Sequence, residues 1–165
     1  MHFFNDLEKL IGAKSKIWIY QFKKELGAED FRHIEEKLDL FSSTWESHGT
    51  KLDAKAFVLE NHFIVIAANE AHFEASGCSI DKSVQVLRSI NEGFDLDLFN
   101  RLNIAVVKNE KVQFYSKAEL QEELLKGNLS FEDFYLDVSV VSGCKINELL
   151  KPLHQSWFYK SLVNA

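Results

Sequence analysis

Cys78 is the first candidate for chemistry in this chain, because it stands among small residues in the stretch Ser-Gly-Cys-Ser-Ile-Asp, residues 76–81, directly before a predicted helix. A helix N-terminus favours negative charge and therefore stabilises a thiolate, the form of cysteine that acts as a nucleophile. Asp81 opposes this effect, and the stretch lacks the local signature of a cysteine protease or a CxxC redox enzyme. Free cysteine is also often a small buried hydrophobe. A nucleophile and a structural thiol therefore stay open as alternatives.

The same segment offers backbone N–H groups to a ligand. Several N–H groups that precede a helix form a common binding site for small anions. We therefore expect a small anionic ligand at this loop. The candidate binding residues are Ser76, Gly77, Ser79, Asp81 and His72. Ser79 and Asp81 also fit an ordinary capping role at the start of the helix.

Topology predicts which residues surround Cys78. A predicted helix ends at His48 and Gly49, and the chain then crosses the sheet twice in a hairpin before the next helix begins near Ser79. Two crossings return the chain to the side of the sheet that it left. The end of the first helix, the end of the second hairpin strand and the start of the second helix should therefore share one edge of the sheet. The residues expected there are His48, Glu70, His72 and Cys78. In a thiol-dependent enzyme, His48 would act as the base and Glu70 would orient it.

Each of these candidate residues also has a possible structural role. His48 in the last turn of a helix would meet the terminal carbonyl groups, and Trp45 would be the last core residue of that helix. The four residues at the predicted edge lack the paired spacing of zinc motifs, so we predict no metal and no cofactor. Arg101 and Cys144 are expected at the opposite edge, which disfavours a disulfide between Cys78 and Cys144.

Hydrophobic periodicity predicts the elements that position these residues. The predicted strands are residues 16–22, 55–60, 62–68, 103–107, 111–115 and 134–141, and the predicted helices are residues 28–49, 79–92, 116–127 and 145–151. Hairpins between helices indicate an α+β class: a single domain over residues 1–165, with a largely antiparallel or mixed sheet of about five or six strands built from two hairpins and covered by helices. Residues 1–14 would be an N-terminal extension. Residues 153–165 would be an aromatic tail that docks on the domain or on a second subunit.

Composition limits the partners. The net charge of −6 argues against nucleic acid, which is bound through phosphate neutralisation by Lys and Arg. The sequence contains no apolar run of the roughly 20 residues that a membrane span requires. With two cysteines and no basic, apolar leader, a reducing cytoplasm is expected. The expected partner is an unknown small ligand or a protein, and the expected state is a monomer or homodimer.

Several motifs resemble a small uncharacterised bacterial family. They are Trp-Glu-Ser-His-Gly at residues 45–49, Ser-Gly-Cys-Ser-Ile-Asp-Lys-Ser at 76–83, Leu-Phe-Asn-Arg at 98–101 and Ser-Trp at 156–157. The family's members often carry the label "ABC transporter ATPase", and the resemblance runs from about Ile17 to Trp157. The label implies ATP hydrolysis, but residues 77–83 are one residue short of a Walker A loop and lack its second glycine. We therefore expect no ATPase activity.

Two functions follow as alternatives. The first is a cytoplasmic binding or interaction module that holds a small anionic ligand before the second helix. The second is a small thiol-dependent hydrolase or transferase that uses Cys78 and His48. Because core and capping signals outnumber catalytic motifs in this sequence, the binding module is the leading hypothesis.

Overall fold

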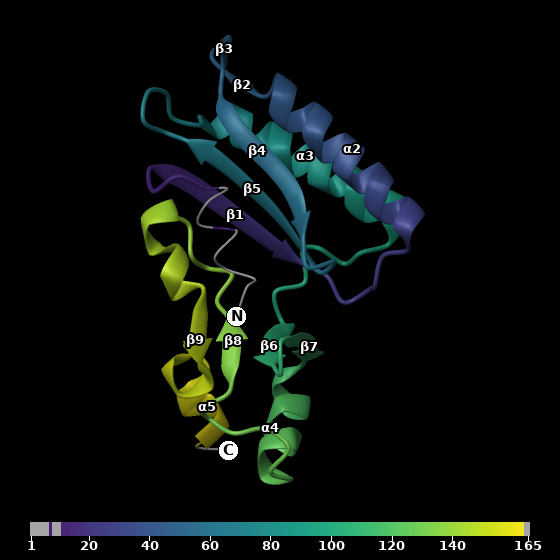
Figure 1. The fold of residues 1–165 in the computed structure, drawn as a ribbon, viewed down its shortest axis with the longest axis vertical. Coiled ribbons are helices and arrows are strands. Elements are labelled where there is room, and N and C mark those ends of the chain that lie inside the picture. The colour runs from purple at the N-terminus through teal and green to yellow at the C-terminus, as the bar shows by residue number, and fades with distance from the viewer. Residues whose placement is uncertain (1–6, 8–10, 164–165) are drawn as a thin grey trace.

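A three-stranded antiparallel sheet with strand order β1-β5-β4 forms the centre of one half of the computed structural model, which describes residue 7 and residues 11–163 (Figure 1). Its strands are β1 (Ser15–Gln21), β4 (Asp53–Leu59) and β5 (Phe63–Asn69). Two long helices, α2 (Ala28–Thr44) and α3 (Gly77–Phe94), cover one face of this sheet. A short antiparallel ribbon of β2 (Glu46–Ser47) and β3 (Thr50–Lys51) follows α2.

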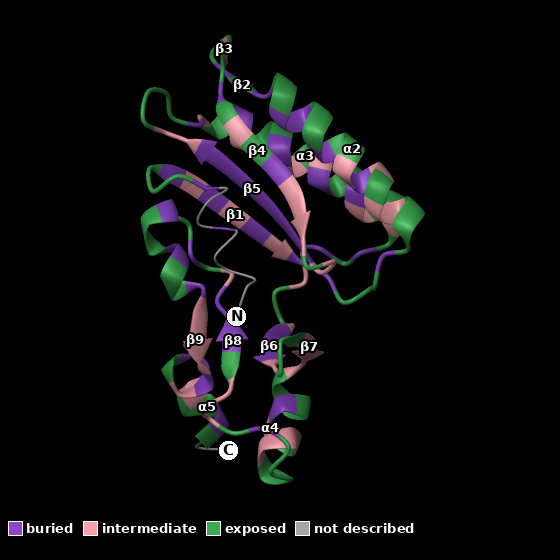
Figure 2. Ribbon diagram, viewed as in Figure 1, coloured by how far each residue is buried: buried purple, intermediate pink, exposed green. Residues whose placement is uncertain are grey.

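The central strand β5 is buried on both faces, as Figure 2 shows. Ile64 and Ile66 point into the core beneath α2 and α3, whereas Phe63 and Val65 point into a core on the opposite face. Successive side chains of a strand alternate between the two faces, so a continuous apolar run fits a strand that is covered on both sides.

A four-stranded antiparallel sheet lies in the other half of the molecule, with strand order β7-β6-β8-β9. Its strands are β6 (Ile104–Lys108), β7 (Lys111–Tyr115), β8 (Phe134–Leu136) and β9 (Leu150–Pro152). The helices of this half are α4 (Lys117–Leu125), η1 (Gly143–Glu148), η2 (Leu153–Gln155) and α5 (Tyr159–Val163), of which η1 and η2 are 3-10 helices.

One apolar core joins the two sheets. Ile17 of β1 and Val65 of β5 pack in the same cluster as Ala105 of β6 and Leu136 of β8. The backbone N–H of Ile17 also donates to the carbonyl of Val141, at 3.0 Å. These contacts tie the segment around η1 to the sheet of the other half.

The α+β class, the antiparallel pairing and both hairpins are confirmed. The strands divide between separate sheets instead of forming one. The helix predicted from residue 116 is present as α4 and opens with a capping box, in which the Ser116 side chain accepts from the Glu119 N–H and the Glu119 carboxylate accepts from the Ser116 N–H. Among the described residues, no helix combines the length and the apolar character that a bilayer crossing requires.

The C-terminal region differs from the prediction in two places. The strand predicted over residues 134–141 ends at Leu136, because the Asp137 carboxylate accepts from the Ser139 N–H and turns the chain. The helix predicted over residues 145–151 is instead a 3-10 helix that ends at Glu148, followed by β9.

The aromatic tail docks on the parent chain. Phe158 is buried, with its ring centroid 5.2 Å from that of Tyr135, and Leu162 lies in the same cluster. Trp157 remains 79% exposed. In the predicted N-terminal extension, Leu7 and Ile11 are buried in the core shared by the two sheets, and the predictions for residues 1–6 and 8–10 lie outside the described residues.

Candidate functional site

The predicted edge exists: the end of α2, the end of β5 and the start of α3 meet there (Figure 1). The Trp45 indole N–H donates to the carbonyl of Ser79, at 2.8 Å. The backbone N–H of Ser76 donates to the hydroxyl of Ser47, at 3.3 Å. These bonds connect segments about thirty residues apart in the chain, as the count of two strand crossings predicted.

Trp45 has the structural role that was predicted for it. Its side chain is 2% exposed and packs against Trp18 and Phe41, with ring centroids 5.9 and 5.0 Å away. A buried indole of this kind usually finds a partner for its N–H, which is here the Ser79 carbonyl. Trp45 therefore fixes the end of α2 against the start of α3.

Helix α3 begins two residues earlier than predicted. Ser76 is its N-cap, and the Ser76 hydroxyl accepts from the Ser79 N–H at 3.3 Å. Ser79 is consequently buried inside the first turn, and its own hydroxyl donates to the Ser76 carbonyl. Asp81 lies beyond the first turn and is exposed. The predicted capping roles of Ser79 and Asp81 are therefore wrong, and the first turn carries no acidic residue.

The N-terminus of α3 is open to solvent. Gly77 and Cys78 are both exposed, and a Cβ added at Gly77 would meet nothing within 4 Å. The N–H of Ser79 is bonded to the cap, and that of Ile80 donates to the Ser76 carbonyl at 2.9 Å. The N–H groups of Gly77 and Cys78 have no acceptor within the described part of the chain, so they are the groups that a ligand would meet.

Glu70 and His72 belong to the loop that leads to α3. The Glu70 carboxylate accepts from the Ala75 N–H at 3.1 Å, so this side chain closes its own loop. His72 is exposed in the same loop, next to the exposed ring of Phe73. Glu70 thus reaches the predicted edge but is occupied by a structural hydrogen bond.

His48 lies at the tip of a hairpin instead of in the last turn of a helix. Helix α2 ends at Thr44, and β2 and β3 pair Ser47 with Thr50. His48 and Gly49 form the two-residue turn, with φ of 51° and 78°. Positive φ at both central positions is typical of the type I′ turn, which suits tight hairpins. The prediction of a helix that runs to His48 and Gly49 is therefore wrong.

The hydrogen bonds that would connect a nucleophile, its base and the residue that orients the base are not formed among the described residues. Across residues 11–163, no hydrogen bond joins His48 to Cys78 or to Glu70. In that same range, no group of three or more His, Cys, Asp or Glu side chains is arranged to hold a metal ion.

The two cysteines are free and exposed, but Cys144 does not lie where it was predicted. Ser142, two residues before it, pairs with Lys16 at the start of β1, and Lys16 in turn pairs with Ala68 near the end of β5. Cys144 thus lies at the same end of the sheet as Cys78 but on the opposite face, because η1 packs in the core away from α3. Arg101 lies at the far end, as predicted, because Phe99, two residues before it, packs against Tyr20 with ring centroids 5.9 Å apart, and Tyr20 pairs with Ile64 beside the β4–β5 turn. Burial raises the pKa of Tyr20, and the charge of Arg101 opposes that rise.

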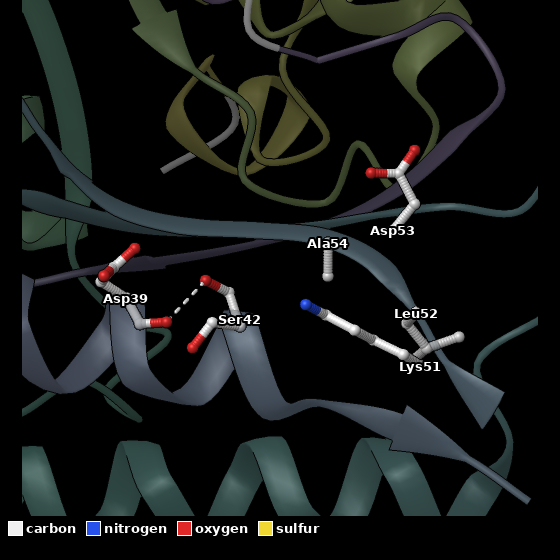
Figure 3. A pocket seen from close by; sticks show the side chains of 7 residues that line it. Asp39, Ser42, Lys51, Leu52, Asp53 and Ala54 are labelled. Atoms are coloured by element: carbon white, nitrogen blue, oxygen red, sulfur yellow. Dashed lines mark hydrogen bonds between the residues drawn. The ribbon is translucent and has the colours of Figure 1, made fainter. Parts of the chain in front are cut away.

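A polar hollow of about 420 Å³ lies at the end of the sheet where β5 ends and α3 begins. It is formed between α2 and the segment from β3 to β4 (Figure 3). It is lined by Asp39, Ser42, Ser43, Lys51, Leu52, Asp53 and Ala54. Lys51 extends its ammonium group into the hollow toward Ser42. Sequence analysis missed these residues, because polar side chains on a helix and beside a strand end are ordinary surface features until the fold brings them together.

Comparisons of the chain with protein-family models, with curated proteins and with solved structures find no match.

Proposed function

We propose that this protein is a binding module that holds a small anionic ligand at the N-terminus of α3. The observation that carries the proposal is the start of α3 at Gly77, which leaves Gly77 and Cys78 exposed and the first turn free of acidic side chains. Unpaired N–H groups and the positive end of the helix dipole favour a negative charge there. The two free cysteines fit a reducing compartment, so we propose the cytoplasm as its location.

Nearby charges affect how strongly this terminus would attract an anion. Lys82 stands in the second turn of α3, and its ammonium group lies 3.8 Å from the Glu46 carboxylate. Both side chains are more than half exposed, so this ion pair is weak and is readily exchanged for an anionic ligand. Asp81 counteracts Lys82, but it lies outside the turn whose N–H groups point at the ligand.

Substitution of Gly77 tests the proposal with a matched pair of variants. Proline is well tolerated at the first position of a helix, where it removes only the N–H group. Ser76 already has φ −72° and ψ 165°, a conformation that suits the residue before a proline. Gly77→Pro should therefore fold normally but bind phosphate less well, whereas Gly77→Ala keeps the N–H group and should bind as the parent does.

The measurement is a titration with inorganic phosphate at constant ionic strength, followed by the backbone amide signals of Cys78 and Ser79. Saturable shifts that are weakened in Gly77→Pro but not in Gly77→Ala support the site. Shifts that fail to saturate, or that are equal in the two variants, would show only non-specific screening and would overturn the proposal. Cys78→Ser should bind phosphate unchanged, because the proposed contacts are made by the backbone.

The alternative is a thiol-dependent hydrolase or transferase in which Cys78 is the nucleophile and His48 the base. It is less well supported, because His48 stands at the turn of a separate hairpin and Glu70 is bonded to Ala75. Alkylation of the two exposed thiols tests this alternative, with Cys144 as an internal reference. If His48→Asn slows modification of Cys78 but not of Cys144, the enzyme hypothesis replaces the binding module.

A further inference from the structure

We infer that the hollow between α2 and β3–β4 is a binding site for a small zwitterion, with the ligand's carboxylate at Lys51 and its ammonium group at Asp39. This site is separate from the N-terminus of α3 and does not depend on the function proposed for it. The β2–β3 ribbon connects the two locations, because its Ser47 bonds to Ser76 and its Lys51 lines the hollow.

Two residues of opposite charge, Asp39 and Lys51, line this hollow without forming an ion pair with each other. The Lys51 ammonium group has no carboxylate within ion-pair distance and no hydrogen-bond acceptor among the described residues. The Asp39 carboxylate likewise has no partner in that part of the chain. Asp53 is different, because its carboxylate accepts from the Asn69 amide at 2.9 Å and points away from Lys51 in Figure 3. The hollow therefore presents one available cation and one available anion.

The C-terminal turn of α2 lies beyond Asp39, on the side of Ser42 and Lys51, so it adds little to the attraction of an ammonium group at Asp39. The C-terminus of a helix carries partial negative charge, and the last turn of α2 contains no basic residue to balance it. However, hydroxyl groups already satisfy the nearby carbonyls: Ser42 donates to Asp39 at 3.2 Å, and Ser43 donates to Leu40 at 2.9 Å. A ligand ammonium group would thus be held mainly by the Asp39 carboxylate.

The size and lining of the hollow fit a small ligand that has an apolar middle. A volume of about 420 Å³ falls within the range of small-molecule sites, which is about 300–1,000 Å³. Leu52 is 2% exposed and forms an apolar wall with Ala54, whereas Asp39, Ser43 and Lys51 are exposed at the rim. Methylene groups between the two charges of a ligand would lie against Ala54, because the protein itself already covers Leu52.

The test is a titration of the full chain with zwitterions of increasing length, namely glycine, β-alanine, γ-aminobutyrate and 5-aminovalerate. Propylamine and propionate serve as analogues that carry a single charge. We expect at least one zwitterion to give saturable amide shifts at Ser42, Lys51 and Ala54. Each single-charge analogue should bind about tenfold more weakly, which corresponds to the loss of one charge-assisted hydrogen bond.

Single substitutions test whether Asp39 and Lys51 each bind one end of the zwitterion. Asp39→Asn and Lys51→Met should each weaken binding of the best zwitterion by about tenfold. Asp30→Asn, on the same helix, and Lys111→Met, on β7, are matched charge controls that should bind as the parent does. Three results would each overturn the inference. They are the absence of saturation with every zwitterion, single-charge analogues that bind as tightly as the best zwitterion, and control variants that lose as much affinity as Asp39→Asn and Lys51→Met. Binding of phosphate at α3 is read from different amide signals, so failure of one site is distinguishable from failure of the other.

Discussion

At the scale of single residues, Trp45 contributes most to the candidate site by packing and by one hydrogen bond. Trp45→Ala removes a buried ring and should lower the free energy of unfolding by about 3–5 kcal/mol. Trp45→Phe keeps an aromatic ring against Trp18 and Phe41 but loses the bond to the Ser79 carbonyl and part of the buried ring, so the expected cost is smaller, about 1–3 kcal/mol. Urea unfolding followed by circular dichroism measures both values. If the two variants lose the same free energy of unfolding, the buried ring of Trp45 does not contribute more than its hydrogen bond.

Asp137 is the residue through which acid should weaken the fold. Its carboxylate accepts from the Lys151 ammonium group at 3.0 Å, from the Ser139 N–H at 3.1 Å and from the Ser139 hydroxyl. Burial raises the pKa of the Asp137 carboxyl, but these hydrogen bonds together lower it below its ordinary value. The neighbouring phenol of Tyr135 has a raised pKa, because it is buried and faces the Asp137 charge.

The sign of the pH dependence follows from the lowered pKa of Asp137. Its contribution to stability is complete above the pKa of an unfolded aspartate, about 3.9, and is lost as pH falls through the lower pKa of the folded state. Asp137→Asn should lower the free energy of unfolding at neutral pH by about 1–3 kcal/mol and flatten its decline in acid. Urea midpoints measured from neutral to acidic pH provide the check. If the free energy of unfolding of Asp137→Asn falls with decreasing pH as steeply as that of the parent, other carboxylates cause the loss of stability in acid.

At the scale of elements, the β2–β3 hairpin yields a prediction about its turn. Asn-Gly is the preferred sequence of a type I′ turn, so His48→Asn should keep or stabilise the ribbon. Gly49 has φ of 78°, and Gly49→Ala should destabilise the ribbon by about 1–2 kcal/mol. Hydrogen exchange of the Thr50 amide measures both effects. Faster exchange in His48→Asn than in Gly49→Ala would show that His48 makes contacts that a turn residue does not need.

Local signals predicted those elements whose determinants lie close together in sequence. The apolar stripe of α2, the capping box at Ser116 and the turn at Asn109 each depend on residues within a few positions of one another. The end of α2 was not predictable in this way, because its apolar stripe continues to Trp45. What ends the helix is the pairing of β2 with β3, together with the bond from Trp45 to Ser79 of another helix. Both depend on tertiary structure.

At the scale of the whole molecule, the choice of strand partners could not be predicted from sequence. Periodicity shows that a segment is a strand but not which strand it joins, so the hairpins were predicted while the division into separate sheets was not. β8 pairs with β6, from which β7 and α4 separate it in the chain, and with β9, from which η1 separates it. The convergence of the end of α2, the end of β5 and the start of α3 was predictable because it needed only a count of crossings. The hollow was not, because it depends on how α2 packs against β4.

The close approach of η1 to the segment before β1 gives the prediction at this scale. A Cβ added at Gly143 would overlap the carbonyl oxygen of Gly12 and lie 3.2 Å from that of Ser15. Both of these neighbours are backbone atoms, so Gly143→Ala must push the two segments apart. This should cost about 1–3 kcal/mol.

Gly93→Ala is the matched control for Gly143→Ala. Gly93 lies inside α3, where an added Cβ meets nothing within 4 Å, so alanine should stabilise the helix by about 0.5–1 kcal/mol. Urea unfolding compares the two variants, and exchange of the Ile17 amide, which donates to Val141, reports directly on the junction between the halves. Gly143→Ala should speed that exchange, and Gly93→Ala should slow it or leave it unchanged. If Gly143→Ala alters neither the urea midpoint nor the Ile17 exchange, the two halves are not held together by this backbone contact.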